Sequence, residues 1–101
     1  MQTLLVQKDQ LDELDMLKKD YFNTILQYQT DCLRHFQAKN REKTLDSLSK
    51  LAETASYAYD LEILKEASFL QGMVCVFFCY WNEAIKHFKN AVRIFLSLNS
   101  L

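Results

Sequence analysis

The chain has 101 residues, of which 50% are hydrophobic and 25% are charged, and its net charge is -1. This length suits one small domain with a modest core, and the composition is that of a folded chain. The near-neutral charge excludes the strong positive field with which proteins attract nucleic acids or acidic membrane surfaces.

The scarcity of turn-forming residues predicts an all-α protein. The chain has no proline and one glycine, although sheets and loop-rich folds need both at their turns. The longest run without a charged residue, 67–82, is too short to cross a bilayer. The N-terminal residues lack the pattern of a secretory signal. We therefore expect a cytoplasmic, intracellular protein that has no membrane partner.

The three cysteines, Cys32, Cys75 and Cys79, form no CxxC pair. Cys75 and Cys79 lie four residues apart on one predicted helix, which is poor geometry for a disulfide between them. We expect reduced thiols that pack as small apolar side chains in a reducing compartment.

The first two predicted helices span residues 3–19 and 21–37, with a break at 18–20. The first is amphipathic, with leucines at helical spacing and acids on the other face: Leu4, Leu11, Leu14 and Leu17, against Asp9, Asp12, Glu13 and Asp15. The second carries two apolar rows, which predict cover on two sides: Tyr21, Ile25, Tyr28, Cys32 and His35, and beside them Phe22, Leu26, Leu33 and Phe36.

Three more helices are predicted over residues 42–57, 61–79 and 82–98. Asn40 and Asp60 stand where N-caps of the first two are expected. The helix over 61–79 is apolar on nearly every side from Ala67 onward, which predicts burial or a partner. The last helix has a second apolar row without cover in this chain and a basic stripe beside it: Ile85, Val92 and Leu96, and Lys86, Lys89 and Arg93.

The chain resembles itself at a period of 40 residues, which is typical of stacked helical hairpins. Tyr28, Cys32, Thr44, Leu48 and Leu51 align with Ser68, Gly72, Ala84, Phe88 and Ala91. The second unit resembles a tetratricopeptide repeat (TPR), because small residues stand at 72, 84 and 91 and an aromatic stands at 88. The unit departs from that pattern at Ser68, Gln71 and Cys75, and the period exceeds the usual 34 or so residues.

The resemblance implies a right-handed α-solenoid fragment of about five helices in stacked antiparallel hairpins. Its parts would be an N-terminal helix (1–19), a degenerate TPR-like hairpin (20–60) and a TPR-like hairpin (61–101). In the second hairpin, the helices would touch at the repeat-packing residues Gly72, Ala84, Phe88 and Ala91. A HEAT-like repeat and an unrelated helical bundle are the alternatives.

In TPR-like proteins the first helix of each hairpin lines a concave groove that binds peptides. The groove positions are Leu26, Gln29, Leu33 and Phe36, with Thr30 and Gln37, and then Phe69, Met73, Val76 and Phe77, with Glu66. The resemblance thus implies a non-enzymatic protein–protein interaction adaptor or scaffold for an apolar or amphipathic helical peptide. In an alternative interpretation, these positions do not form a free groove, because the N-terminal helix covers Phe69, Met73 and Phe77.

A second hypothesis is a structural assembly subunit, or a fragment of a longer repeat protein. Two repeats are fewer than a solenoid usually needs. Such a chain would oligomerise through the uncapped end face Ile85, Val92 and Leu96.

Sites for chemistry are not expected. Cys79, Glu83 and His87 have ligand-like spacing, but the predicted turn separates them and no fourth metal ligand is evident. One glycine cannot build a phosphate loop or an oxyanion pocket. We therefore expect no metal, no cofactor, no catalytic residue and no nucleic acid partner, since the basic residues alternate with acids.

Overall fold

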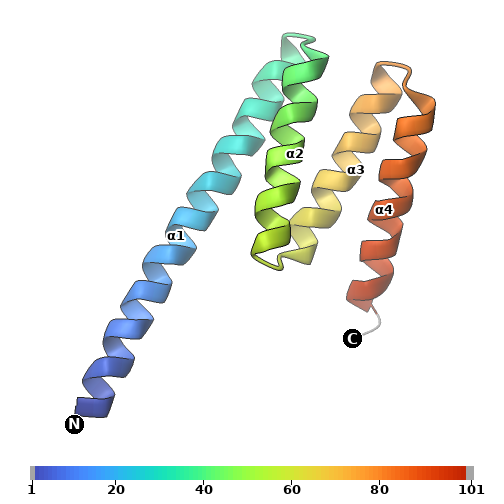
Figure 1. Cartoon of the computed structure of the whole chain (residues 1–101). Coiled ribbons are helices and arrows are strands. Elements are labelled where there is room, and N and C mark those ends of the chain that lie inside the picture. Colours follow the sequence, from blue (N-terminus) through green and yellow to red (C-terminus); the bar gives the residue numbers. More distant parts are fainter. Residues whose placement is uncertain (1, 100–101) are drawn as a thin grey trace.

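Residues 2–99, the part of the chain that the structure describes, fold into four helices and no strand, which confirms an all-α protein. In this computed structural model the side chains are described for residues 10–99. The helices are α1 (Gln2–Gln37), α2 (Arg41–Tyr57), α3 (Leu61–Phe77) and α4 (Trp81–Asn99). Consecutive helices run antiparallel and side by side (Figure 1).

The predicted break at 18–20 is wrong, because α1 is one continuous helix of 36 residues. Four helices therefore stand where five were predicted. Lys18, Lys19 and Asp20 offer no glycine or proline to interrupt the helix, and a continuous backbone ladder is then the lower-energy choice. At 1.5 Å per residue, α1 is about 54 Å long.

Both predicted N-caps are confirmed. The Asn40 side chain accepts a hydrogen bond from the backbone N–H of Lys43 at 3.1 Å, and Asp60 accepts one from Ile63 at 3.2 Å. These bonds satisfy amides of the first helical turn that have no partner within the helix. The other boundaries move by one or two residues, since α2 starts at Arg41, α3 ends at Phe77 and α4 starts at Trp81.

The three turns share one backbone geometry although none contains glycine. Each has a residue with left-handed backbone, and these residues are spaced by twenty: Lys39 (φ 57°), Tyr59 (φ 53°) and Cys79 (φ 64°). The next N–H bonds in each case to a carbonyl five residues earlier: Asn40 to His35, Asp60 to Ala55 and Tyr80 to Cys75. This is the Schellman ending of a helix, which is usually formed with glycine. A chain with a single glycine thus turns three times within its described part.

Replacing Tyr59 with glycine is expected to raise the free energy of unfolding by about 0.5–1 kcal/mol. The left-handed backbone costs a side-chain-bearing residue about 1–2 kcal/mol, and the extra chain entropy of glycine offsets part of the gain. Tyr59 is 89% exposed, so little packing is lost. Tyr57→Gly is the matched control, since Tyr57 is 79% exposed but helical, and it should destabilise. Urea unfolding measures both, and a loss of stability in Tyr59→Gly would contradict the prediction.

The helices form a thin open array, in which each helix packs against its neighbour in sequence. The array measures 62 × 34 × 13 Å along its principal axes. One cluster of its core lies on α1, α2 and α3 and consists of Ile25, Leu48, Leu51, Ala67 and Val74. Helix α4 adds the buried residues Ala84, Ala91 and Ile94. The N-terminal half of α1 projects beyond the end of α2 (Figure 1), and residues 10–20 are all exposed.

Candidate functional site

The hairpin of α3 and α4 is built around Gly72. A Cβ atom added to this buried glycine would lie 2.6 Å from Cε1 of Phe88, so the absence of a side chain leaves room for the Phe88 ring. Ala84 and Ala91, the other predicted small packing residues, are both buried in α4. The Phe88 ring also contacts Phe69 of α3, with centroids 5.6 Å apart.

Two departures from the TPR pattern are buried polar residues that bond to neighbouring helices. Ser68 accepts a hydrogen bond from Nδ2 of Asn90 on α4 at 3.1 Å. Gln71 donates from Nε2 to the hydroxyl of Ser49 on α2 at 3.4 Å. Because buried polar groups need partners, these bonds set how α2, α3 and α4 align.

Most of the predicted groove residues line one apolar groove between α1 and α3, with a volume of about 430 Å³. The residues that do so are Gln29, Leu33, Phe36, Phe69, Met73 and Phe77. Of the other predicted positions, Leu26, Thr30, Gln37 and Val76 lie outside its lining, and Glu66 lines a second hollow. The groove also has residues that are not among the positions implied by the TPR-like resemblance: Cys32, Leu48, Leu51, Leu70 and Val74. Leu48 and Leu51 come from α2, which closes the groove between its two walls.

The groove is open, with large apolar side chains in contact with solvent. Leu33 is 58% exposed on α1, and Phe69, Met73 and Phe77 are 51%, 49% and 54% exposed on α3. At one end the walls meet, because the rings of Phe36 and Phe77 make an edge contact at 5.0 Å. Apolar surface of this kind is typical of a binding site.

The interpretation in which the N-terminal helix covers these residues is wrong. Phe69, Met73 and Phe77 are about half exposed, and the N-terminal half of α1 runs away from the array (Figure 1). The reason is the missing break at 18–20. Without a turn, the first residues continue the line of α1 and do not fold back over the groove.

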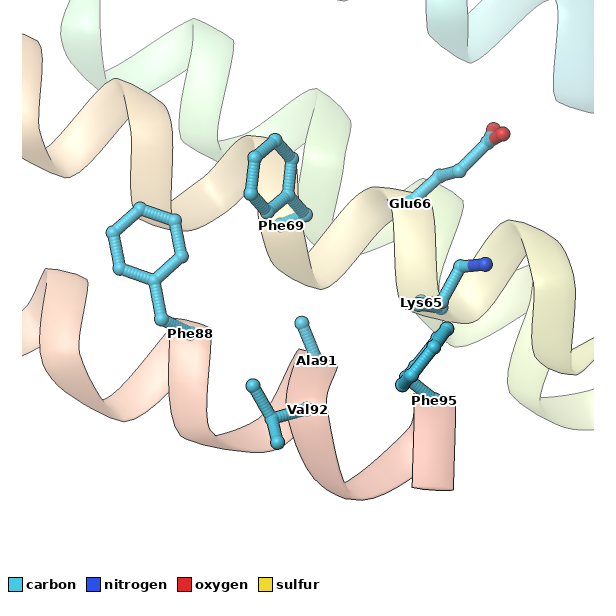
Figure 2. A pocket seen from close by; sticks show the side chains of 7 residues that line it. All are labelled: Lys65, Glu66, Phe69, Phe88, Ala91, Val92 and Phe95. Carbon is cyan, nitrogen blue, oxygen red and sulfur yellow. The ribbon is translucent and has the colours of Figure 1, made fainter. Parts of the chain in front are cut away.

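A second hollow of about 380 Å³ lies between α3 and α4. Figure 2 shows Phe69 and Phe88 beside each other at one end and Lys65 beside Phe95 at the other. The ammonium of Lys65 lies 5.7 Å from the Phe95 ring centroid, in a cation–π contact. Phe69 lines both hollows, so apolar surface continues from α1 to α4. Phe95 is 50% exposed.

The predicted end face on α4 is exposed. Ile85, Val92 and Leu96 are 51%, 56% and 61% exposed. Among the described helices α4 packs against α3 alone, and Val92 also borders the hollow between these two helices. The basic residues Lys86, Lys89 and Arg93 are exposed along this apolar row.

Two long-range side-chain contacts tie turns to earlier helices. The hydroxyl of Tyr21, near the middle of α1, donates to Oδ2 of Asp60 at 2.8 Å. Arg41, at the start of α2, donates to the hydroxyl of Tyr80, and its guanidinium lies 4.6 Å from the centroid of that ring. The contacts are offset by twenty residues, like the turns themselves.

Burial and the Asp60 carboxylate raise the pKa of Tyr21 to about 12, from an ordinary value of 10.0. Burial also raises the pKa of the Cys32 and Cys75 thiols. A raised thiol pKa lowers the fraction of thiolate, so neither cysteine is activated as a nucleophile.

The Tyr21→Phe variant is expected to lose less stability at alkaline pH than the wild-type protein does. Because the folded-state pKa is raised, the stabilisation from Tyr21 is fully present below pH 10 and is lost as pH rises towards 12. The variant should be less stable than the wild type at pH 7, by about 1 kcal/mol for one lost hydrogen bond. Above pH 10 this difference should shrink. Urea unfolding between pH 7 and pH 12 measures it, with the 89% exposed Tyr59 changed to Phe as the control. A difference that is constant with pH would contradict the prediction.

The candidate metal ligands are not brought together. Cys79 lies in the last turn, whereas Glu83 and His87 lie on α4. Among the side chains that the structure describes, those of residues 10–99, no three of His, Cys, Asp or Glu cluster as a metal site would require. No helix within residues 2–99 combines the length and apolar character needed to cross a membrane.

Comparison of the chain with models of protein families, with curated protein sequences and with solved structures gave no match.

Proposed function

We propose that the protein is a non-enzymatic interaction module that binds an amphipathic helical or apolar peptide in the groove between α1 and α3. The observation that carries the proposal is the open apolar groove of about 430 Å³, with half-exposed aromatic side chains on its wall. A helix that presents apolar residues at positions i, i+3 or i+4 and i+7 could insert them along such a groove.

The chemistry of the lining narrows the class of peptide. Gln29 and the Cys32 thiol are the only groups with polar atoms in the side chains that line the groove. No lysine or arginine is among them, so a peptide that is anchored by its carboxylate terminus lacks a partner there. An apolar peptide gains from burial at about 25 cal/mol for each Å² removed from water.

The proposal includes the arrangement as a right-handed TPR-like solenoid fragment and a cytoplasmic, reducing location. In this arrangement α1 with α2, and α3 with α4, are the two stacked hairpins. The neighbour-only packing and the twenty-residue spacing of the turns support a repeat. The free cysteines Cys32, Cys75 and Cys79 support a reducing compartment.

A peptide-display selection with the wild-type protein, followed by anisotropy titrations of the selected peptides, tests the groove. Phe77→Asp places a charge on the groove wall and should weaken binding by about tenfold or more. Val76→Asp is the matched control, since Val76 is the preceding residue, is 36% exposed and lies outside the lining. It should change affinity about twofold at most. If a folded Phe77→Asp protein binds as the wild type does, the groove is not the site.

A second candidate function is that of an assembly subunit, in which α4 contributes the interface. The specific observation is the apolar row Ile85, Val92 and Leu96, each more than half exposed. Sedimentation of the wild type and of Val92→Glu tests this role, which predicts a larger mass for the wild type alone.

A further inference from the structure

We propose that two copies of the chain associate head to tail, with the projecting half of α1 from one copy packed antiparallel on the exposed face of α4 from the other. The projecting half is the part of α1 that precedes Tyr21. The inference depends on the end-face role of α4 proposed above and adds the identity of the segment that covers it.

The projecting half continues an interface that already exists within the chain. Tyr21, Ile25 and Tyr28 pack in or against the core, in a row with alternating spacings of four and three residues. The same spacing leads back through Lys18 to Leu14 and Leu11, which are 51% and 61% exposed. The helix face that α2 covers in one half of α1 therefore lacks cover in the other half. Lys18 can lay its methylene stem on this row and keep its ammonium in water.

The charges of the two uncovered faces are partly complementary. The α4 row has cations along one flank, Lys86, Lys89 and Arg93, all exposed. Of these, Lys86 already pairs with Glu83 at 3.5 Å. Asp12 and Asp15, also exposed, stand on the corresponding flank of Leu11, because each residue of a helix is rotated by about 100°, and Lys19 stands between them. Asp15 is the acid nearest to the apolar row. Antiparallel packing brings these two flanks opposite each other. Paired in this way, the charges would favour this orientation over the parallel one.

The dimensions also match, and a second copy is required. Helix α4 has 19 residues, which is about 28 Å. The part of α1 before Tyr21 has a similar length. Within one chain the two surfaces cannot meet, because α1 and α4 lie at opposite edges of the array and share no contact (Figure 1).

An interface between two different surfaces leaves one of each unused in every dimer. Association of this type continues into an open chain or closes into a ring. The average mass should therefore rise with concentration beyond that of a dimer. The groove between α1 and α3 takes no part in the contact and stays accessible to peptide.

Two variants that are each defective on one surface give the deciding test. Leu14→Glu disables the α1 surface and Val92→Glu disables the α4 surface. Both positions are more than half exposed, so each variant should melt as the wild type does. Analytical ultracentrifugation from micromolar to millimolar concentration is expected to show growing assemblies for the wild type and monomers for each variant. An equimolar mixture of the variants should form a 1:1 dimer that grows no further, because one intact surface of each kind remains.

Several results would overturn the proposal. If the wild-type protein stays monomeric, both the proposed contact between α1 and α4 and the end-face role of α4 are wrong. If Leu14→Glu keeps the wild-type mass while Val92→Glu is monomeric, the end face is real but α4 pairs with something other than α1. If each variant is monomeric and their mixture stays monomeric as well, the α1 and α4 surfaces do not bind each other. The charge contact has its own test: Asp15→Lys and Lys89→Glu should each weaken association, and together, one in each partner, they should restore it. If the two charge reversals together do not restore association, the proposed antiparallel packing is wrong.

Discussion

Leu48→Ala is expected to lower the free energy of unfolding by about 3 kcal/mol. Leu48 is completely buried and belongs to the core cluster with Ile25, Leu51, Ala67 and Val74. Truncation of such a leucine costs about 3–5 kcal/mol, because the burial is lost and a cavity remains. The lower end applies here, since the site borders the open groove and can partly collapse. A domain of this size has a net stability of about 5–15 kcal/mol, so the loss is a large share of it.

Leu17→Ala is the matched control for Leu48→Ala. The same atoms are removed, but Leu17 is 58% exposed in the projecting half of α1. Its effect should stay within about 0.5 kcal/mol. Urea unfolding followed by circular dichroism measures both. Equal effects of the two substitutions would show that the core does not lie on α2.

Gly72→Ala is expected to destabilise the protein by about 1–2 kcal/mol, although alanine is the better helix former by about 1 kcal/mol. The new methyl would lie 2.6–2.9 Å from three atoms of the Phe88 ring. That ring also contacts Phe69 on α3, so any shift away from position 72 disturbs a second aromatic contact.

The same substitution should change sign when Phe88 is first replaced by alanine. Without the ring the methyl meets no obstacle from Phe88, and the helix propensity of alanine then raises the free energy of unfolding by about 1 kcal/mol. A double-mutant cycle over positions 72 and 88 measures this coupling. If Gly72→Ala has the same effect in both backgrounds, the glycine is not required for close approach to Phe88.

The local signals in the sequence predicted the N-caps, because Asn40 and Asp60 bond to backbone amides only three residues away. They failed where no local residue type decides the outcome. The break at 18–20 was inferred from a change of pattern, but nothing in those residues costs the helix enough to end it. The start of α4 was misplaced by one residue because Tyr80 has no side chain typical of a cap. The two N-caps, Asn40 and Asp60, are twenty residues apart, and the same spacing would place the residue before the next helix at position 80.

Only part of the groove was predicted, because its lining also depends on how the helices pack against one another. The TPR-like resemblance assigns groove positions to the first helix of each hairpin, and among them Leu33, Phe36 and Phe77 do line the groove. The groove also needs Leu48 and Leu51 of α2, whose contribution depends on how far apart α1 and α3 are held. That distance is a property of packing between helices and is not encoded in the pattern of either wall. Leu26 and Val76 are groove positions in the TPR-like resemblance but lie outside the lining.

The uninterrupted length of α1 has a mechanical consequence. One rigid rod of 36 residues carries a groove wall at one end and extends into solvent at the other. It therefore has the form of a lever whose fulcrum lies near Tyr21, where the rod is fastened to Asp60. A force that swings the outer arm acts on the wall bearing Leu33 and Phe36, since no joint between them absorbs the rotation.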